Sequence, residues 1–70
     1  MTVSIGKRIK EIRQSLNISQ SELADRMKYL NQSQISKIEN GDRKATAMDL
    51  IEIAKALGVS VDEIIDNKIA

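Results

Sequence analysis

Apolar residues recur along this chain at intervals of three and four positions, which is the period of an amphipathic α-helix. The first repeat predicts a helix over about residues 4–16, with one apolar face formed by Ile5, Ile9, Ile12 and Leu16. Asn17 follows, and asparagine tolerates the left-handed backbone conformation that often ends a helix. No stretch of the sequence has the strict alternation of apolar and polar residues that is typical of a β-strand.

The second helix is predicted from the residues around its start. Ser19 and Glu22 have the spacing of a capping box, in which each side chain accepts a hydrogen bond from the other residue's backbone amide. Ile18, just before the box, and Leu23, just after it, have the spacing of a hydrophobic staple. We therefore expect a helix over about residues 20–28, which buries Leu23, Ala24 and Met27.

The third helix starts in the same way. Asn31 is a suitable N-terminal cap, and Gln34 stands where the second residue of a capping box belongs. The helix is expected over about residues 32–40, and Gly41 marks its end. Its inward residues are Ile35 and Ile38.

Two further helices follow. Thr46 and Asp49 begin the fourth helix, which ends at Gly58 and buries Leu50, Ile53, Ala54 and Leu57. Ser60 begins the fifth helix, in which Ile64 faces inward. The predicted fold is therefore all-α, with five short helices around one aliphatic core.

The length of 70 residues predicts a single domain over residues 1–70, with a C-terminal tail at residues 67–70. No linker is long enough to divide the chain, so we expect no appended effector or catalytic domain. Any signal would then arrive through a partner or through the concentration of the protein.

The composition excludes several kinds of chemistry. The sequence has no cysteine and no histidine, so it offers neither a disulfide nor the usual ligands of a zinc site, and it lacks the side chain most used for acid–base catalysis at neutral pH. Asp62 and Glu63 are adjacent carboxylates, but neighbouring helical positions point about 100° apart and do not serve one site. We expect no enzyme activity, no metal and no cofactor. Without a signal peptide or an apolar run of about 20 residues, the chain is expected to be soluble and cytoplasmic, with no membrane partner.

Charge is distributed unevenly although the net charge is only +1. Residues 1–44 contain nine basic and five acidic side chains, a balance of +4, whereas residues 45–70 contain two basic and five acidic ones, a balance of −3. This segregation of charge is typical of a protein that binds a polyanion on one face and has its acidic residues on another face, directed away from the polyanion.

The second and third predicted helices are joined by only about three residues, 28–30, and so must cross steeply. Residues 19–40 therefore have the arrangement of a helix-turn-helix, whose second helix enters the DNA major groove. A polar face lies opposite the two inward isoleucines, and amides, hydroxyls and an ammonium group are able to hydrogen-bond base edges. The simpler interpretation of such a face, a solvated surface, is disfavoured by the short turn, the Gln-Ser pair at each helix start and the basic first half. The predicted base-contacting residues are Gln32, Ser33, Ser36 and Lys37.

Phosphate contacts are predicted from helix starts and from the loop after the third helix. A helix start presents free backbone amides and the positive end of the helix dipole, which suit a phosphate oxygen. The loop after Gly41 adds two cations. The phosphate-contacting residues predicted in this way are Gln20, Ser21, Asn31, Arg43 and Lys44.

The segments SQSELADRM, NQSQISKIENG and TAMDLIEIAKALGVSVDEII, in that order, resemble the lambda-repressor-like, xenobiotic-response-element (Cro/repressor-type) family of helix-turn-helix regulators. The resemblance covers residues 5–65 and implies a five-helix domain, usually dimeric, that binds operators of inverted symmetry. By position it implies that Gln20 contacts phosphate and supports the recognition helix. It also implies that Asn40, with Arg43 and Lys44, contacts the phosphate backbone. It also implies a largely buried ion pair between Arg13 and Glu39, which we interpret as structural.

The turn between the second and third helices departs from the family pattern. It is one residue longer than usual and has KYLN where a glycine normally stands. Either the second helix continues further or the turn is wider, and both would move the third helix. Tyr29 lies in this turn. Its hydroxyl could contact a phosphate, but packing is the favoured interpretation.

The last predicted helix and the tail have a small apolar stripe, which is a candidate dimer surface formed by Val61, Ile65 and Ile69. The sequence pattern fits equally well with the alternative that Val61 and Ile65 complete the core. The sequence predicts a dimeric repressor that binds double-stranded DNA at an inverted-repeat operator. The alternative function is a protein-interaction module, such as an antitoxin or anti-regulator component that binds a toxin or another regulator.

Overall fold

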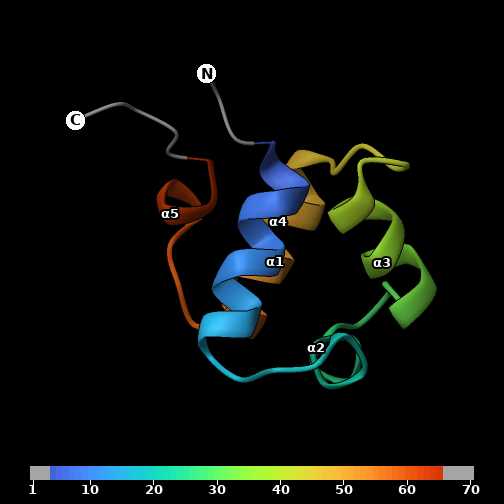
Figure 1. Cartoon of the computed structure of the whole chain (residues 1–70), viewed down its shortest axis with the longest axis horizontal. Coiled ribbons are helices and arrows are strands. Elements are labelled where there is room, and N and C mark those ends of the chain that lie inside the picture. The colour runs from blue at the N-terminus through green and yellow to red at the C-terminus, as the bar shows by residue number, and fades with distance from the viewer. Residues whose placement is uncertain (1–3, 66–70) are drawn as a thin grey trace.

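A computed structural model describes residues 4–65, and within this range the chain forms five α-helices and no strand. They are α1 (Ile5–Ser15), α2 (Gln20–Arg26), α3 (Gln32–Asn40), α4 (Ala47–Leu57) and α5 (Val61–Ile65) (Figure 1). The all-α, five-helix prediction is confirmed. None of these helices combines the length and the apolar character needed to span a bilayer.

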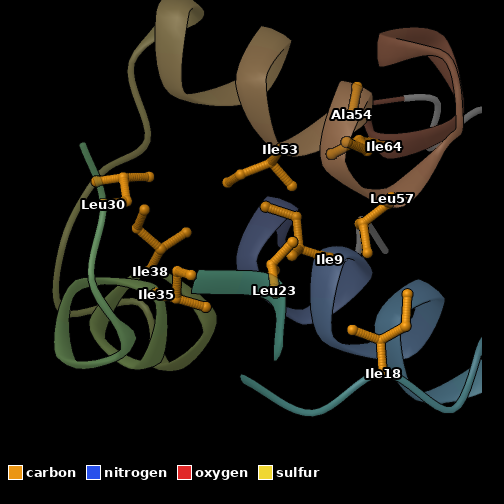
Figure 2. Close-up of a cluster of buried hydrophobic side chains, with 10 residues drawn as sticks. All are labelled: Ile9, Ile18, Leu23, Leu30, Ile35, Ile38, Ile53, Ala54, Leu57 and Ile64. Carbon is orange, nitrogen blue, oxygen red and sulfur yellow. The ribbon is translucent and has the colours of Figure 1, made fainter. Parts of the chain in front are cut away.

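All five helices contribute to one aliphatic core. Two connecting residues, Ile18 and Leu30, complete it, and Figure 2 shows the side chains converging from the surrounding ribbons. Burial of these side chains is the main favourable term in folding, at about 25 cal/mol per Å² of apolar surface removed from water. The core residues are Ile9, Ile18, Leu23, Leu30, Ile35, Ile38, Ile53, Ala54, Leu57 and Ile64.

The expected helix starts are largely present. The side chain of Asn31 accepts a hydrogen bond from the Gln34 amide at 2.8 Å, and the Gln34 side chain accepts one from the Asn31 amide at 2.9 Å. Ser19 accepts from the Glu22 amide at 3.0 Å, but the reciprocal half of that capping box was predicted wrongly. The Glu22 carboxylate lies instead 3.7 Å from the Arg26 guanidinium, one turn further along the helix.

Some predicted boundaries and burials need correction. The second helix ends at Arg26 rather than at residue 28, because Met27 has an extended backbone with ψ of 154°. The connection to α3 is therefore the wider turn rather than a longer helix. On α1, Ile9 is fully buried, whereas Ile5 and Leu16 are 39% and 45% exposed at the two ends of the predicted apolar face. Three residues predicted to be buried lie half-buried at the margin of the core: Ala24, Met27 and Leu50.

Helix α1 lies between α3 and α5, which pack on opposite sides of it (Figure 1). Helix α2 packs against both α3 and α4. Asn17 ends the first helical segment with a φ of 60°, as its identity predicts, and Gly41 and Gly58 end α3 and α4 with φ of 85° and 75°. This arrangement places α3 at one side of the molecule, away from α5.

Candidate nucleic-acid interface

Helix α3 separates a buried apolar side from an exposed polar one. Ile35 and Ile38 are 1% and 2% exposed and belong to the core. We define the outer face of α3 by the residues predicted to contact bases, of which Gln32, Ser33 and Lys37 are exposed and Ser36 is half-buried. The structure thus leaves most of these polar side chains accessible on a helix whose two isoleucines are buried.

The inner side of α3 is fixed by a buried ion pair with α1. Arg13 and Glu39 are 7% and 6% exposed. The Arg13 Nε donates to Glu39 Oε2 at 2.7 Å, and its Nη2 donates to Oε1 at 3.0 Å. The remaining Nη1 donates to the carbonyl oxygen of Ile18 at 2.7 Å. Because both charges are paired and hydrogen-bonded, the pair satisfies the condition under which ionised groups persist inside a protein.

Gln20 adds a third side chain to this ion pair. Its Nε2 donates to Glu39 Oε1 at 3.0 Å, so α2 is tied to α3 at the same carboxylate. This geometry places Gln20 in a supporting role for α3. Its Nε2 still has a second hydrogen for a phosphate oxygen, since an amide nitrogen donates twice.

The remaining residues predicted to contact phosphate lie around α3. Ser21, Asn40 and Lys44 are exposed, whereas Arg43 is half-buried. Asn31 is exposed, its side-chain oxygen caps α3, and its amide nitrogen is the side-chain group able to donate to a phosphate oxygen. Arg43 and Lys44 line a pocket of about 280 Å³ between the start of α1 and the loop after α3, together with Ser4, Ile5, Gly6, Ile38, Gly41 and Ala45.

Gly6 is a structural determinant that was not among the predicted residues. It is buried in α1 where this helix crosses α3, and a Cβ there would overlap the carbonyl oxygen of Ile38 and crowd the Cα of Glu39. The backbones of the two helices approach this closely only because Gly6 has no side chain. A signal for it exists in the sequence, since a glycine inside a predicted helix is unfavourable unless packing requires it.

Tyr29 was predicted to pack, but the residue is 48% exposed and its hydroxyl has an internal partner. The Oη donates to Oδ1 of Asp49 at 3.0 Å. Partial desolvation of the phenol, followed by this hydrogen bond and the negative charges of Asp49 and Glu52, raises the pKa of Tyr29 above its ordinary value. The turn before α3 is thus attached to α4 by a side-chain hydrogen bond rather than by packing alone.

Asp49 is 2% exposed and was predicted only as part of a helix start. Its Oδ2 accepts from the Thr46 amide at 3.0 Å and lies 3.9 Å from Arg43 Nη2. Desolvation by itself would raise the pKa of Asp49, but the hydrogen bonds from Thr46 and Tyr29 and the charge of Arg43 outweigh it. The pKa of Asp49 therefore lies below its ordinary value, and the carboxylate is ionised at neutral pH.

The fold and the position of the outer face define a class of protein. A helix-turn-helix family model matches residues 9–64, which is most of the chain. The chain belongs to this family, in its lambda-repressor-like, xenobiotic-response-element branch, whose members are DNA-binding transcriptional regulators. The family resemblance drawn from the sequence is confirmed.

Solved structures of similar proteins agree with this assignment. The restriction-modification controller protein C.AhdI from Aeromonas hydrophila is 28% identical, with a TM-score of 0.84 and 90% of each chain covered. The P22 c2 repressor, solved in complex with a synthetic operator, is 27% identical, with a TM-score of 0.82, and the match covers 96% of this chain and 100% of the repressor chain. The clp gene regulator ClgR from C. glutamicum is 22% identical with a TM-score of 0.86, covering 91% of this chain and 82% of ClgR, and it supports the fold alone.

Proposed function

We propose that this regulator is a sequence-specific binder of double-stranded DNA that acts as a dimeric repressor at an inverted-repeat operator. The observation that supports this most directly is the outer face of α3, where hydrogen-bonding side chains are exposed on a helix whose inner side is held by Glu39. A rigid helix with an adaptable polar face is suited to the major groove of B-DNA, which admits one α-helix.

Base recognition is assigned to the outer face of α3. Gln32 is in the first turn and has both a donor and an acceptor, the combination that adenine N7 and N6 require. Lys37, one turn further along, donates to guanine O6 and N7. Ser33 and Ser36 are short enough to allow close approach of the helix to the groove.

Phosphate contacts are assigned to the two flanks of α3. Gln20 and Ser21 open α2, whose first backbone amides and positive dipole end face a phosphate oxygen in this arrangement. The other contacts come from the cap and the last residue of α3 and from the loop that follows it: Asn31, Asn40, Arg43 and Lys44. These contacts set the register of the protein on the duplex without selecting its sequence.

A second copy of the chain is needed because one recognition helix reads only a few base pairs. Ile65, at the end of α5, is 43% exposed and remains the candidate dimer contact. Val61 is half-buried against the core, so it is available only in part, and Ile69 lies outside the described residues. Because α5 is on the far side of α1 from α3, a dimer formed there leaves both outer faces free.

A protein partner, such as a toxin or another regulator, is the second candidate. Met48 and Ile51 are 57% and 41% exposed and lie one turn apart on α4, so they present apolar surface on this helix. If binding to a protein is the whole function, replacing Gln32, Ser33 and Lys37 together by alanine leaves it intact. If DNA is the target, the same triple variant loses activity.

The experiment that tests the proposal is selection from a random duplex library at near-physiological salt, followed by sequencing of the bound DNA. We expect an inverted repeat with half-sites about one helical turn apart. Recovery of only weak, salt-sensitive binding to any duplex would contradict specific recognition by this chain alone.

Sedimentation tests the dimer separately. We expect a dimer at high micromolar concentration in the wild type and a shift toward monomer in Ile65→Ser, with Ile51→Ser on α4 as the matched control. A strict monomer in the wild type would overturn the dimer proposal without affecting the assignment of α3.

A further inference from the structure

The carboxylate of Asp49 contacts the chain on both sides of α3. Tyr29 lies three residues before the first residue of α3, and Arg43 lies three residues after the last. Both reach the same buried side chain on α4, through Oδ1 and Oδ2 respectively. One carboxylate thus connects the start and the end of the helix assigned to base recognition.

The attachment at the start of α3 depends on one hydrogen bond. Within the described part of the chain, Tyr29 Oη to Asp49 Oδ1 is the one hydrogen bond that joins residues 27–31 to a distant element. The other bonds of this turn are to its own neighbours, such as that from the Met27 amide to the Ala24 carbonyl. Leu30 anchors the turn in the core, but an apolar contact does not fix direction as a hydrogen bond does.

The attachment at the end of α3 is electrostatic. Arg43 Nη2 lies 3.9 Å from Asp49 Oδ2, and among the described residues its buried Nε has no hydrogen-bond partner. The guanidinium is therefore held near the protein surface chiefly by the charge of Asp49. From there it remains able to donate to a DNA phosphate, which is the role proposed for it above.

Asp49 is itself held rigidly. The Thr46 amide donates to its Oδ2 at 3.0 Å, and the Asp49 amide donates to Thr46 Oγ1 at 3.0 Å. This reciprocal capping box fixes the position of the carboxylate at the start of α4. The segments before and after α3 are therefore both attached to a fixed group.

We propose that Asp49, through Tyr29 and Arg43, is a positioning residue that sets the tilt of α3 and thereby the base edges that its first turn reaches. The inference rests on the proposed function, in which α3 reads bases. It also accounts for the turn that is one residue longer than the family pattern and lacks glycine. The extra length would leave the start of α3 loosely placed, and the Tyr29 hydroxyl supplies the missing attachment.

The test uses Tyr29→Phe, which removes the hydroxyl and keeps the ring. Binding is measured to the selected operator and to each of its single-base variants. We expect Tyr29→Phe to lose about 2- to 10-fold in discrimination at the positions read by the first turn of α3, the equivalent of one hydrogen bond. Affinity for unrelated duplex DNA and its salt dependence should stay as in the wild type, because Tyr29 contacts no phosphate in this proposal.

A double-mutant cycle tests the dependence on Asp49. Asp49→Ala should also lose discrimination, and Tyr29→Phe added to it should have little further effect, since the hydroxyl then has no acceptor at this position of α4. Fully additive losses would show that the two residues act independently, which overturns the proposal. Ile64→Val, in the core on α5, is the matched control for a general loss of stability, and it should discriminate as the wild type does.

A readout without DNA separates this inference from the proposed function. Amide hydrogen exchange in the free protein should be faster at the first turn of α3 in Tyr29→Phe than in Ile64→Val. If the wild type selects no DNA, the proposed function fails, while faster exchange still supports the attachment of α3 through Asp49. Unchanged exchange in Tyr29→Phe overturns the inference. If the wild type does select DNA, unchanged discrimination in Tyr29→Phe overturns it as well.

Discussion

The guanidinium of Arg13 on α1 donates two hydrogen bonds to the carboxylate of Glu39 on α3, at 2.7 and 3.0 Å, where both side chains are nearly inaccessible to solvent. Glu39 lies between Ile38, in the core, and the exposed Asn40. The same turn of α3 thus has a core contact, a buried charge and a residue proposed to contact DNA. The structural residues and the proposed DNA contact are adjacent on one helix, so a substitution of Glu39 is expected to affect both stability and DNA binding.

Removal of one member of this pair should be costly. Glu39→Ala leaves the Arg13 charge buried without its partner, and we expect the free energy of unfolding to fall by about 3–5 kcal/mol. Urea denaturation monitored by circular dichroism measures this. The double variant Arg13→Met/Glu39→Leu removes both charges and should recover much of the loss. A loss of under about 1 kcal/mol in Glu39→Ala would contradict the buried character of the pair.

Gly6→Ala should separate α1 from α3. The added methyl meets the backbone at Ile38, which cannot rotate away as a side chain would, so we expect destabilisation of about 1–3 kcal/mol. This reverses the usual gain from replacing glycine by alanine in a helix. Thermal unfolding beside Lys10→Ala, an exposed position on the same helix, provides the comparison. Equal or higher stability in Gly6→Ala would show that the two backbones are not in close contact.

The conformation of Asn17 predicts opposite effects of two substitutions. Its φ of 60° is costly for a β-branched residue, and Asn17→Val should lose about 1–2 kcal/mol of unfolding free energy. Asn17→Gly should keep the stability close to that of the wild type, because glycine adopts this conformation without steric cost. Urea denaturation curves of the two variants and the wild type measure this difference. Equal stability of the Val and Gly variants would rule out left-handed backbone at this position.

Asp49 should make stability depend on pH in acid. The folded-state pKa of Asp49 lies below its unfolded value of about 3.9, so its contribution is complete well above that pH and is lost as the pH falls through the folded pKa. The stability advantage of the wild type over Asp49→Asn should therefore be largest near neutral pH and shrink in acid. Urea unfolding of both proteins from pH 7 to pH 3 measures it. A difference that is the same at every pH would contradict the lowered pKa.

Two substitutions should separate base recognition from phosphate binding. Gln32→Ala should cost about 1–3 kcal/mol of binding to the selected operator and relax specificity at one or two positions. Lys44→Ala, at an exposed position proposed to contact phosphate only, should weaken binding to all sequences alike and reduce the dependence of affinity on salt by about one phosphate contact. Titrations of operator and unrelated duplex at several salt concentrations distinguish them. Equal effects of both variants on unrelated DNA would refute this division.

Local patterns in the sequence were sufficient for most of the secondary structure. The starts at Asn31 and Thr46 and the left-handed Asn17 follow from interactions within a few residues, which a sequence displays directly. The end of the second helix was placed too late, because no glycine marks it. Leu30, four residues after this end, is 3% exposed in the core, and that burial is a property of the packed molecule.

The sequence by itself determined the helix starts, most of the apolar residues of the core and the polar character of α3, because each is encoded by spacing along one helix. Only the tertiary structure decided that Gly6 touches Ile38 and that Tyr29 and Arg43 meet at Asp49. Tyr29 and Asp49 are 20 residues apart, and no local pattern signals a contact over that distance. Such contacts arise when helices cross, since the crossing rather than the spacing brings their side chains within hydrogen-bonding distance.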